Sequence, residues 1–192
     1  MPKPLLRWFW NHLAAWCVLF RQRERAIELY RRMLELDPND AVALASLGFN
    51  YAELGRKREA LAIFDRMVAL TPDDAEMHFD RGFLLQELND HDAAMAAFRA
   101  AIERNPDHDR ALYGLALSLI STRRPEEAIE PLKRNTQLQP MSPYGWYQLA
   151  RVQHSLGRIA ETQKILDHLA KFDPDVARQL ARETRLVAKT LS

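Results

Sequence analysis

The chain has 192 residues and carries 27 Lys and Arg against 26 Asp and Glu, which gives a formal net charge of +1. This balance excludes the broad basic field that sequence-independent nucleic-acid binding requires. Cys17 is the only cysteine, which excludes an internal disulfide framework. The abundance of Ala, Leu, Glu and Arg over Gly favours a helical protein.

Five prolines recur at a constant interval of 34 residues, and each ends a helix-like run beside a polar residue. They are Pro38, Pro72, Pro106, Pro140 and Pro174. A fixed period of this length predicts a stacked array of repeats, in which each unit packs only on its neighbours. After a short leader at 1–6, the period divides the chain into units 7–40, 41–74, 75–108, 109–142 and 143–176.

The first unit opens on an apolar helix, predicted over residues 7–20. The stretch from Leu5 to Phe20 is shorter than the ~20 apolar residues of a membrane span and is interrupted by Arg7 and Asn11. The same interruptions argue against a secretory signal peptide. We therefore expect a cytoplasmic protein.

This helix carries more apolar side chains than a terminal helix normally shows to water. Trp10, Leu13, Ala14 and Cys17 supply its predicted core face. The apolar residues that remain as a candidate oligomer or partner face are Trp8, Phe9, Trp16, Leu19 and Phe20. Three interpretations stay open, namely a dimer or partner interface, a membrane-facing surface close to basic residues, and packing inside the array.

The second unit, 41–74, shows the repeat pattern most clearly. Asp40 is a predicted N-cap for its first helix. The first helix then carries Leu44, Leu47, Gly48 and Tyr51, and the second helix carries Ala60, Phe64 and Met67 before Pro72. This series resembles the tetratricopeptide repeat, with Leu44 at the usual Trp position. The same offsets recur in all five units.

The resemblance implies an all-α, right-handed superhelical solenoid of five tetratricopeptide-like helix–turn–helix repeats. It further implies a single repeat domain over 7–176 and a C-terminal capping helix over 177–192. In the capping segment, Val176, Leu180, Val187 and Leu191 are predicted to line one face of a helix that runs from 176 to 191.

Several residues depart from the family pattern. Arg81 occupies a usual Leu position, whereas Asn135 and Thr162 occupy usual Ala positions. Pro125 suits the first turn of a helix, but Pro131 lies inside the same helix and predicts a kink there.

No motif in the sequence predicts catalysis, a metal site or a cofactor. None of the six histidines has a zinc-binding spacing, and we expect His91 and His108 to be solvated at turns. The carboxylates beside the repeat prolines are expected to cap helices. We therefore predict a protein that is not an enzyme and binds no cofactor.

In tetratricopeptide-like arrays, the first helices line a concave groove, and the family's inward positions can be transferred to this chain. They predict an aromatic and partly acidic peptide-binding surface. Its residues are Phe49, Glu53, Glu76, Phe79, Asp80, Phe83, Glu87, Arg110, Tyr113, Tyr144, Tyr147 and Arg151. Packing between repeats is the competing role for the rings. The family's carboxylate clamp is doubtful here, because Glu76 and Asp80 stand at its positions.

The predicted function is a non-catalytic protein–protein interaction scaffold or adaptor that binds a peptide segment or helix. The alternative is a membrane-associated assembly accessory of the pilus or envelope biogenesis type. The expected partner is a protein or peptide, with no nucleic acid and no small-molecule substrate. A homo-oligomer through the N-terminal helix and a weak membrane association both stay open.

Overall fold

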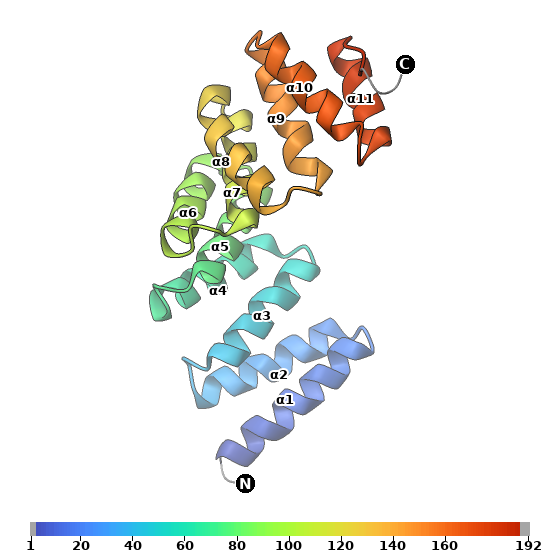
Figure 1. Cartoon of the computed structure of the whole chain (residues 1–192). Coiled ribbons are helices and arrows are strands. Elements are labelled where there is room, and N and C mark those ends of the chain that lie inside the picture. The colour runs from blue at the N-terminus through green and yellow to red at the C-terminus, as the bar shows by residue number, and fades with distance from the viewer. Residues whose placement is uncertain (1–2, 189–192) are drawn as a thin grey trace. The chain divides into compact units, whose positions relative to one another are not determined.

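The computed structural model describes residues 3–188, and these residues form eleven helices and no strand (Figure 1). The all-α prediction is therefore confirmed. The right-handed superhelix and the number of five repeats stay predictions.

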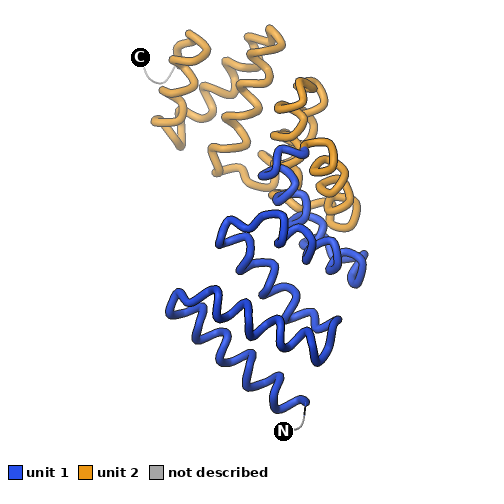
Figure 2. Tube along the Cα trace, turned by 180° about the vertical axis from the view of Figure 1, so that it is seen from behind, with its two compact units in different colours: residues 1–90 blue, residues 91–192 orange. Residues whose placement is uncertain are grey.

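The chain divides into two compact units, residues 1–90 and 91–192 (Figure 2). The helices of the first unit are α1 (Lys3–Leu19), α2 (Arg23–Leu36), α3 (Ala41–Glu53), α4 (Lys57–Leu70) and α5 (Ala75–Glu87). The helices of the second unit are α6 (His91–Arg104), α7 (Asp109–Ser121), α8 (Pro125–Leu138), α9 (Pro143–Ser155), α10 (Ile159–Leu169) and α11 (Pro174–Thr184). Within each unit, every helix packs against the next one along the chain.

Four of the five periodic prolines follow helix ends, as predicted, and the fifth begins a helix. Helices α2, α4, α6 and α8 each end two residues before their proline, and Pro174 is the first residue of α11. A proline cannot continue the hydrogen-bond ladder of a preceding helix, so it is a reliable stop at this distance.

The backbone turns in the same way after α1, α3, α5, α7 and α9, with the same period. The residue that leaves the first helix adopts the left-handed conformation, with φ between 58° and 73°. These residues are Arg21, Gly55, Asn89, Arg123 and Gly157. Only two of them are glycine, the residue for which this conformation carries no steric cost.

The predicted repeat positions form the hydrophobic cores. In the first unit, Leu44, Leu47, Phe64 and Met67 are all buried. Helices α3 and α4 approach closely at Gly48, where an added Cβ would lie 3.0 Å from Cε2 of Phe64. The small residue at this position therefore sets the distance between the two helices.

In the second unit, the equivalent positions are buried as well. They are Ala94, Phe98, Leu112, Leu115, Ala116, Leu119, Ala128, Leu132, Leu149, Ala150 and Leu166. The two polar residues at usual Ala positions are also buried, and each has a partner. Asn135 donates through Nδ2 to the carbonyl of Asp109 at 2.9 Å, and the Thr162 hydroxyl donates to the carbonyl of Arg158 at 3.1 Å.

Carboxylates cap three helices, as predicted. Asp40 accepts from the amides of Val42 and Ala43, both at 3.1 Å, and Asp74 and Asp173 cap α5 and α11 in the same way. The prediction for His108 was wrong. This residue is buried, and its Nδ1 accepts from the amide of Ala111 at 3.3 Å, so it caps α7.

The terminal helices differ from their predicted ranges. Helix α1 begins at Lys3, inside the predicted leader, and Leu13 is exposed although it was assigned to the core face. Helix α11 ends at Thr184, because Arg185 turns into the left-handed conformation. Val187 therefore lies beyond the helix and is exposed, and Leu191 falls outside the described residues. Helix α8 continues through Pro131, so this proline does not end it.

Candidate functional site

The predicted binding residues of the first unit lie on α3 and α5, and none of them is buried. We call them the first patch: Phe49, Glu53, Glu76, Phe79, Asp80, Phe83 and Glu87. Phe49 is 55% exposed and Phe83 is 48% exposed, whereas Phe79 is half-buried. The rings of Phe79 and Phe83 lie one turn apart on α5 and stack at a centroid distance of 6.4 Å. These rings form an accessible aromatic surface on the first helices.

Two acidic residues of the first patch already have cationic partners. Arg23 at the start of α2 pairs with Glu53 at 2.9 Å and lies 5.9 Å from the centroid of Phe49. Lys57 at the start of α4 pairs with Glu87 at 2.7 Å. The two pairs join equivalent positions of successive repeats. In each pair, the two partners are 30 residues apart in the sequence. A basic group of a partner would therefore compete with Arg23 and Lys57 for these carboxylates.

The predicted binding residues of the second unit lie on α7 and α9, and none of them is buried either. We call them the second patch: Arg110, Tyr113, Tyr144, Tyr147 and Arg151. Tyr144 is 70% exposed, and Tyr113 is half-buried. Burial raises the pKa of Tyr113, and its hydrogen bond with Gln148 acts in the opposite direction. Tyr144 is thus the ring of this unit that is best placed to meet a partner.

Helix α11 engages two further residues of the second patch, Tyr147 and Arg151. The Tyr147 hydroxyl donates to Oε1 of Glu183 at 2.5 Å and accepts from Gln179 at 2.8 Å. Burial and the neighbouring Glu183 carboxylate raise the pKa of Tyr147. Arg151 also lies 3.6 Å from Glu183. Packing against α11 therefore occupies part of this patch, which is the competing role that the sequence left open.

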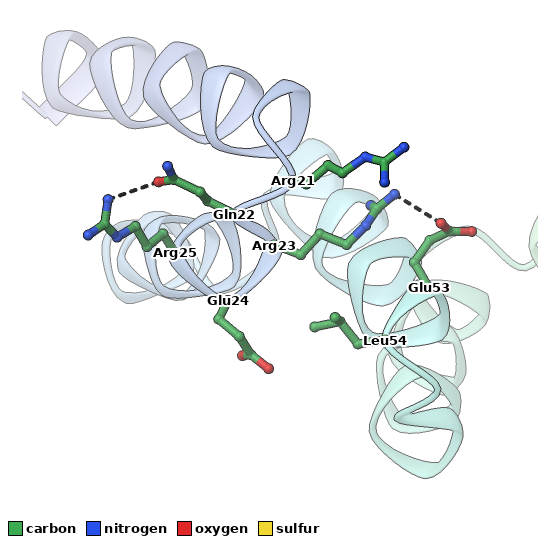
Figure 3. A pocket seen from close by; sticks show the side chains of 7 residues that line it. All are labelled: Arg21, Gln22, Arg23, Glu24, Arg25, Glu53 and Leu54. Carbon is green, nitrogen blue, oxygen red and sulfur yellow. Dashed lines mark hydrogen bonds and ion pairs between the residues drawn. The ribbon is translucent and has the colours of Figure 1, made fainter.

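An open depression of about 780 Å³ lies at the turn between α1 and α2 (Figure 3). Its lining residues are Arg21, Gln22, Arg23, Glu24, Arg25, Glu53 and Leu54. Figure 3 shows Arg23 reaching Glu53, and Arg25 hydrogen-bonded to Gln22 at 2.8 Å. This depression could not be predicted from the sequence, because it depends on the position of the end of α3 beside the turn.

All five predicted residues of the α1 face are exposed, from 47% for Phe9 to 68% for Leu19. Leu5 and Leu13 extend this face beyond the prediction. The interpretation that it packs inside the array is therefore wrong for the described structure. Trp10, Cys17 and Val18 lie on the other side of the helix and pack against the core of the first unit.

Residues 3–188 contain no group of three or more His, Cys, Asp or Glu side chains placed to hold a metal ion. In the same range, no helix combines the length and the apolar character that crossing a membrane requires.

Two family models described as tetratricopeptide repeat match residues 21–78 and 57–113. A third model, described as anaphase-promoting complex, cyclosome, subunit 3, matches residues 87–169. A comparison with curated protein sequences found no match.

Solved structures share the fold over almost the whole chain. A crystal structure of MamA superimposes with a TM-score of 0.82 and 20% identity, and covers 95% of this chain and 97% of that one. YrrB, described as a TPR protein with an unusual peptide-binding site, gives a TM-score of 0.78 at 20% identity, with 92% and 90% covered. MamA from Desulfovibrio magneticus RS-1 gives 0.77 at 20% identity, with 93% and 96% covered. At these identities, the similarity shows the fold alone.

Proposed function

Because the chain is a tetratricopeptide-repeat protein, we propose that it is a non-catalytic scaffold that binds a peptide segment or a helix of a partner protein. The first and second patches are the proposed binding residues. A cytoplasmic location and the lack of a nucleic-acid or small-molecule partner stay predictions.

One observation carries this proposal. The pattern of the repeat assigned twelve residues to the binding surface, and the structure buries none of them. Phe49, Phe83 and Tyr144 leave about half or more of their surface in contact with solvent. Aromatic side chains are costly to leave exposed and effective as anchors when a partner covers them. The structural neighbour YrrB, described as having a peptide-binding site, gives independent support.

The chemistry of the patches defines the expected peptide. Exposed rings require apolar or aromatic anchors on the peptide. Acidic residues beside the rings favour some basic residues, although Arg23 and Lys57 lower the net attraction of Glu53 and Glu87. These ion pairs are solvent-exposed, so each is worth only about 0–1 kcal/mol and can be exchanged for a partner's cation.

A display library of random peptides, selected on the immobilised full-length chain, tests the proposal and supplies the probe. The affinity of the best selected peptide is then measured by fluorescence anisotropy. We expect Phe83→Ala to weaken binding roughly 5- to 30-fold, because it removes an aromatic anchor of about 1–2 kcal/mol. Ile159→Ala on α10 is the control, since Ile159 is similarly exposed (45%) but lies on a second helix.

The proposal fails if the library yields no specific peptide. It also fails if Phe83→Ala and Ile159→Ala bind the selected peptide as tightly as the wild-type protein. Circular dichroism of both variants checks that the fold is retained.

A further inference from the structure

Helix α1 is apolar on two opposite faces. One face, with Ala14 and the partly buried Trp10 and Cys17, packs against the first unit. The other face is exposed along the whole helix. Its residues, the α1 outer face, are Leu5, Trp8, Phe9, Leu13, Trp16, Leu19 and Phe20. At 100° per residue they span roughly 140° of the helix circumference, over a length of about 22 Å.

No charged side chain interrupts the α1 outer face. His12 is the only polar residue between its members, and its ring contacts Trp8 on the same helix. Its ring lies tilted against that of Trp8 at a centroid distance of 4.2 Å, and its Nδ1 lies 2.8 Å from the Trp8 carbonyl oxygen. Trp16 and Phe20 stack at 5.9 Å. The face is thus a continuous strip dominated by aromatic rings.

The charged residues in the stretch of sequence that carries this strip are all basic. Residues 1–23 contain no Asp or Glu. Arg7 and Arg23 pair with Asp40 and Glu53, acidic residues from outside this stretch. Lys3, at the start of α1, and Arg21, just after its end, have no ion pair or hydrogen bond through their side chains among residues 3–188. Two unpaired cations therefore flank the apolar strip, one at each end.

We propose that the α1 outer face binds the surface of an anionic membrane, with the helix lying flat in the headgroup region. Helices of this kind bury Trp, Phe and Leu at the boundary between headgroups and acyl chains, while Lys and Arg contact anionic headgroups. Lys3 and Arg21 can reach the phosphates from the two ends of the strip, because long cationic side chains extend toward the polar layer.

A second copy of the chain fits this face less well. Parallel pairing of two α1 helices would bring together the two ends that carry Lys3 and the two ends that carry Arg21, and antiparallel pairing would bring each Lys3 end to an Arg21 end. Both arrangements place like charges together, whereas an anionic surface neutralises them. This inference goes beyond the proposed function and does not depend on it, because the two patches lie on other helices.

Vesicle flotation of the full-length chain tests the inference. One set of vesicles contains phosphatidylcholine alone, and the other contains about one-third phosphatidylglycerol. We expect the wild-type protein to float with the anionic vesicles, with a blue shift of its tryptophan emission. Trp8→Ser/Trp16→Ser should lower the bound fraction at least tenfold, and Lys3→Glu/Arg21→Glu should lower it by roughly tenfold or more on anionic vesicles. Met141→Ser removes an exposed apolar side chain (69%) outside α1 and outside both patches, and it should change nothing.

The inference is overturned if the wild-type protein stays with neither kind of vesicle, or if both double variants float like the wild-type protein. Light scattering without lipid identifies the competing occupant. A wild-type dimer that Trp8→Ser/Trp16→Ser converts to a monomer, without any vesicle binding, would assign the α1 outer face to a second copy and overturn the membrane proposal. The altered residues are all exposed, and circular dichroism verifies that each variant is folded.

Discussion

Arg123 holds a left-handed backbone conformation at the turn between α7 and α8, with φ of 60°. Gly55 and Gly157 occupy the same repeat position with φ of 73°, where glycine meets no steric penalty. For a residue with a Cβ, this conformation costs roughly 1–2 kcal/mol. The turn geometry is therefore imposed by the packing of the two helices, at the expense of local strain at Arg123.

We predict that Arg123→Gly stabilises the protein by about 0.5–1 kcal/mol, since the relief of strain exceeds the added entropy of the unfolded chain. Chemical denaturation measures the change. Arg99→Gly, at an exposed position inside α6, is the matched control and should destabilise by about 1 kcal/mol. Equal losses for the two variants would contradict this interpretation of the turn.

Asp40 combines two roles at the start of α3. Its carboxylate caps the helix and also accepts hydrogen bonds from Arg7, one of them from Nη2 at 3.0 Å. The Arg7 guanidinium lowers the pKa of Asp40 below its ordinary value, and the backbone amides of Ala43 and Val42 act in the same direction, whereas burial opposes them. The ionised carboxylate is therefore the form that the folded state prefers.

We predict that Asp40→Asn, which keeps a capping oxygen but loses the charge, is less stable than wild type at neutral pH by about 1 kcal/mol. The depressed pKa means that this contribution is fully present above pH ~3.9 and is lost as the pH falls through the lower pKa of the folded state. The difference in unfolding free energy between the two proteins should therefore shrink below about pH 4. A difference that is constant from neutral to acidic pH would contradict the role of the charge.

At the scale of elements, the contact between α6 and α7 depends on a missing side chain. A Cβ at Gly114 would lie 2.6 Å from Cζ of Phe98 and 2.9 Å from two further ring atoms, and Phe98 is fully buried. We predict that Gly114→Ala destabilises by about 1–3 kcal/mol, although alanine is the better helix former. In the double variant with Phe98→Leu, part of the loss should be recovered. Strictly additive losses in thermal unfolding would show that the two residues do not meet.

The helices and their cores could be predicted from the sequence, because the period of the prolines fixes the register of every apolar position. Local sequence signals did not predict the helix ends and the burial that depend on tertiary contacts. Helix α1 begins earlier than predicted, at Lys3, and α11 ends earlier, at Thr184, because the next residue, Arg185, is left-handed. The burial of His108 was not predicted either, because a polar ring normally stays in water. In the structure, its Nδ1 accepts a capping hydrogen bond from the Ala111 amide.

For the candidate binding residues, exposure to solvent could be predicted from the sequence, but their interaction partners could not. Their exposure follows from the repeat register alone, and all twelve positions remain accessible. Their partners do not follow from it. The pairs of Arg23 with Glu53 and of Lys57 with Glu87 join residues 30 positions apart, and the contact of Tyr147 with Glu183 depends on where α11 packs. Predicting such pairs requires knowing how successive helices pack against each other.

At the scale of the whole molecule, the central claim is that a partner peptide binds the first helices and not the second ones. Photo-cross-linking with a selected peptide, carrying a photoreactive group at its apolar anchor, tests this claim most directly. Mass spectrometry of the product should locate the cross-links on α3, α5, α7 or α9, at or beside Phe49, Phe83 and Tyr144. Cross-links confined to α4, α8 or α10 would contradict the assignment of the binding surface.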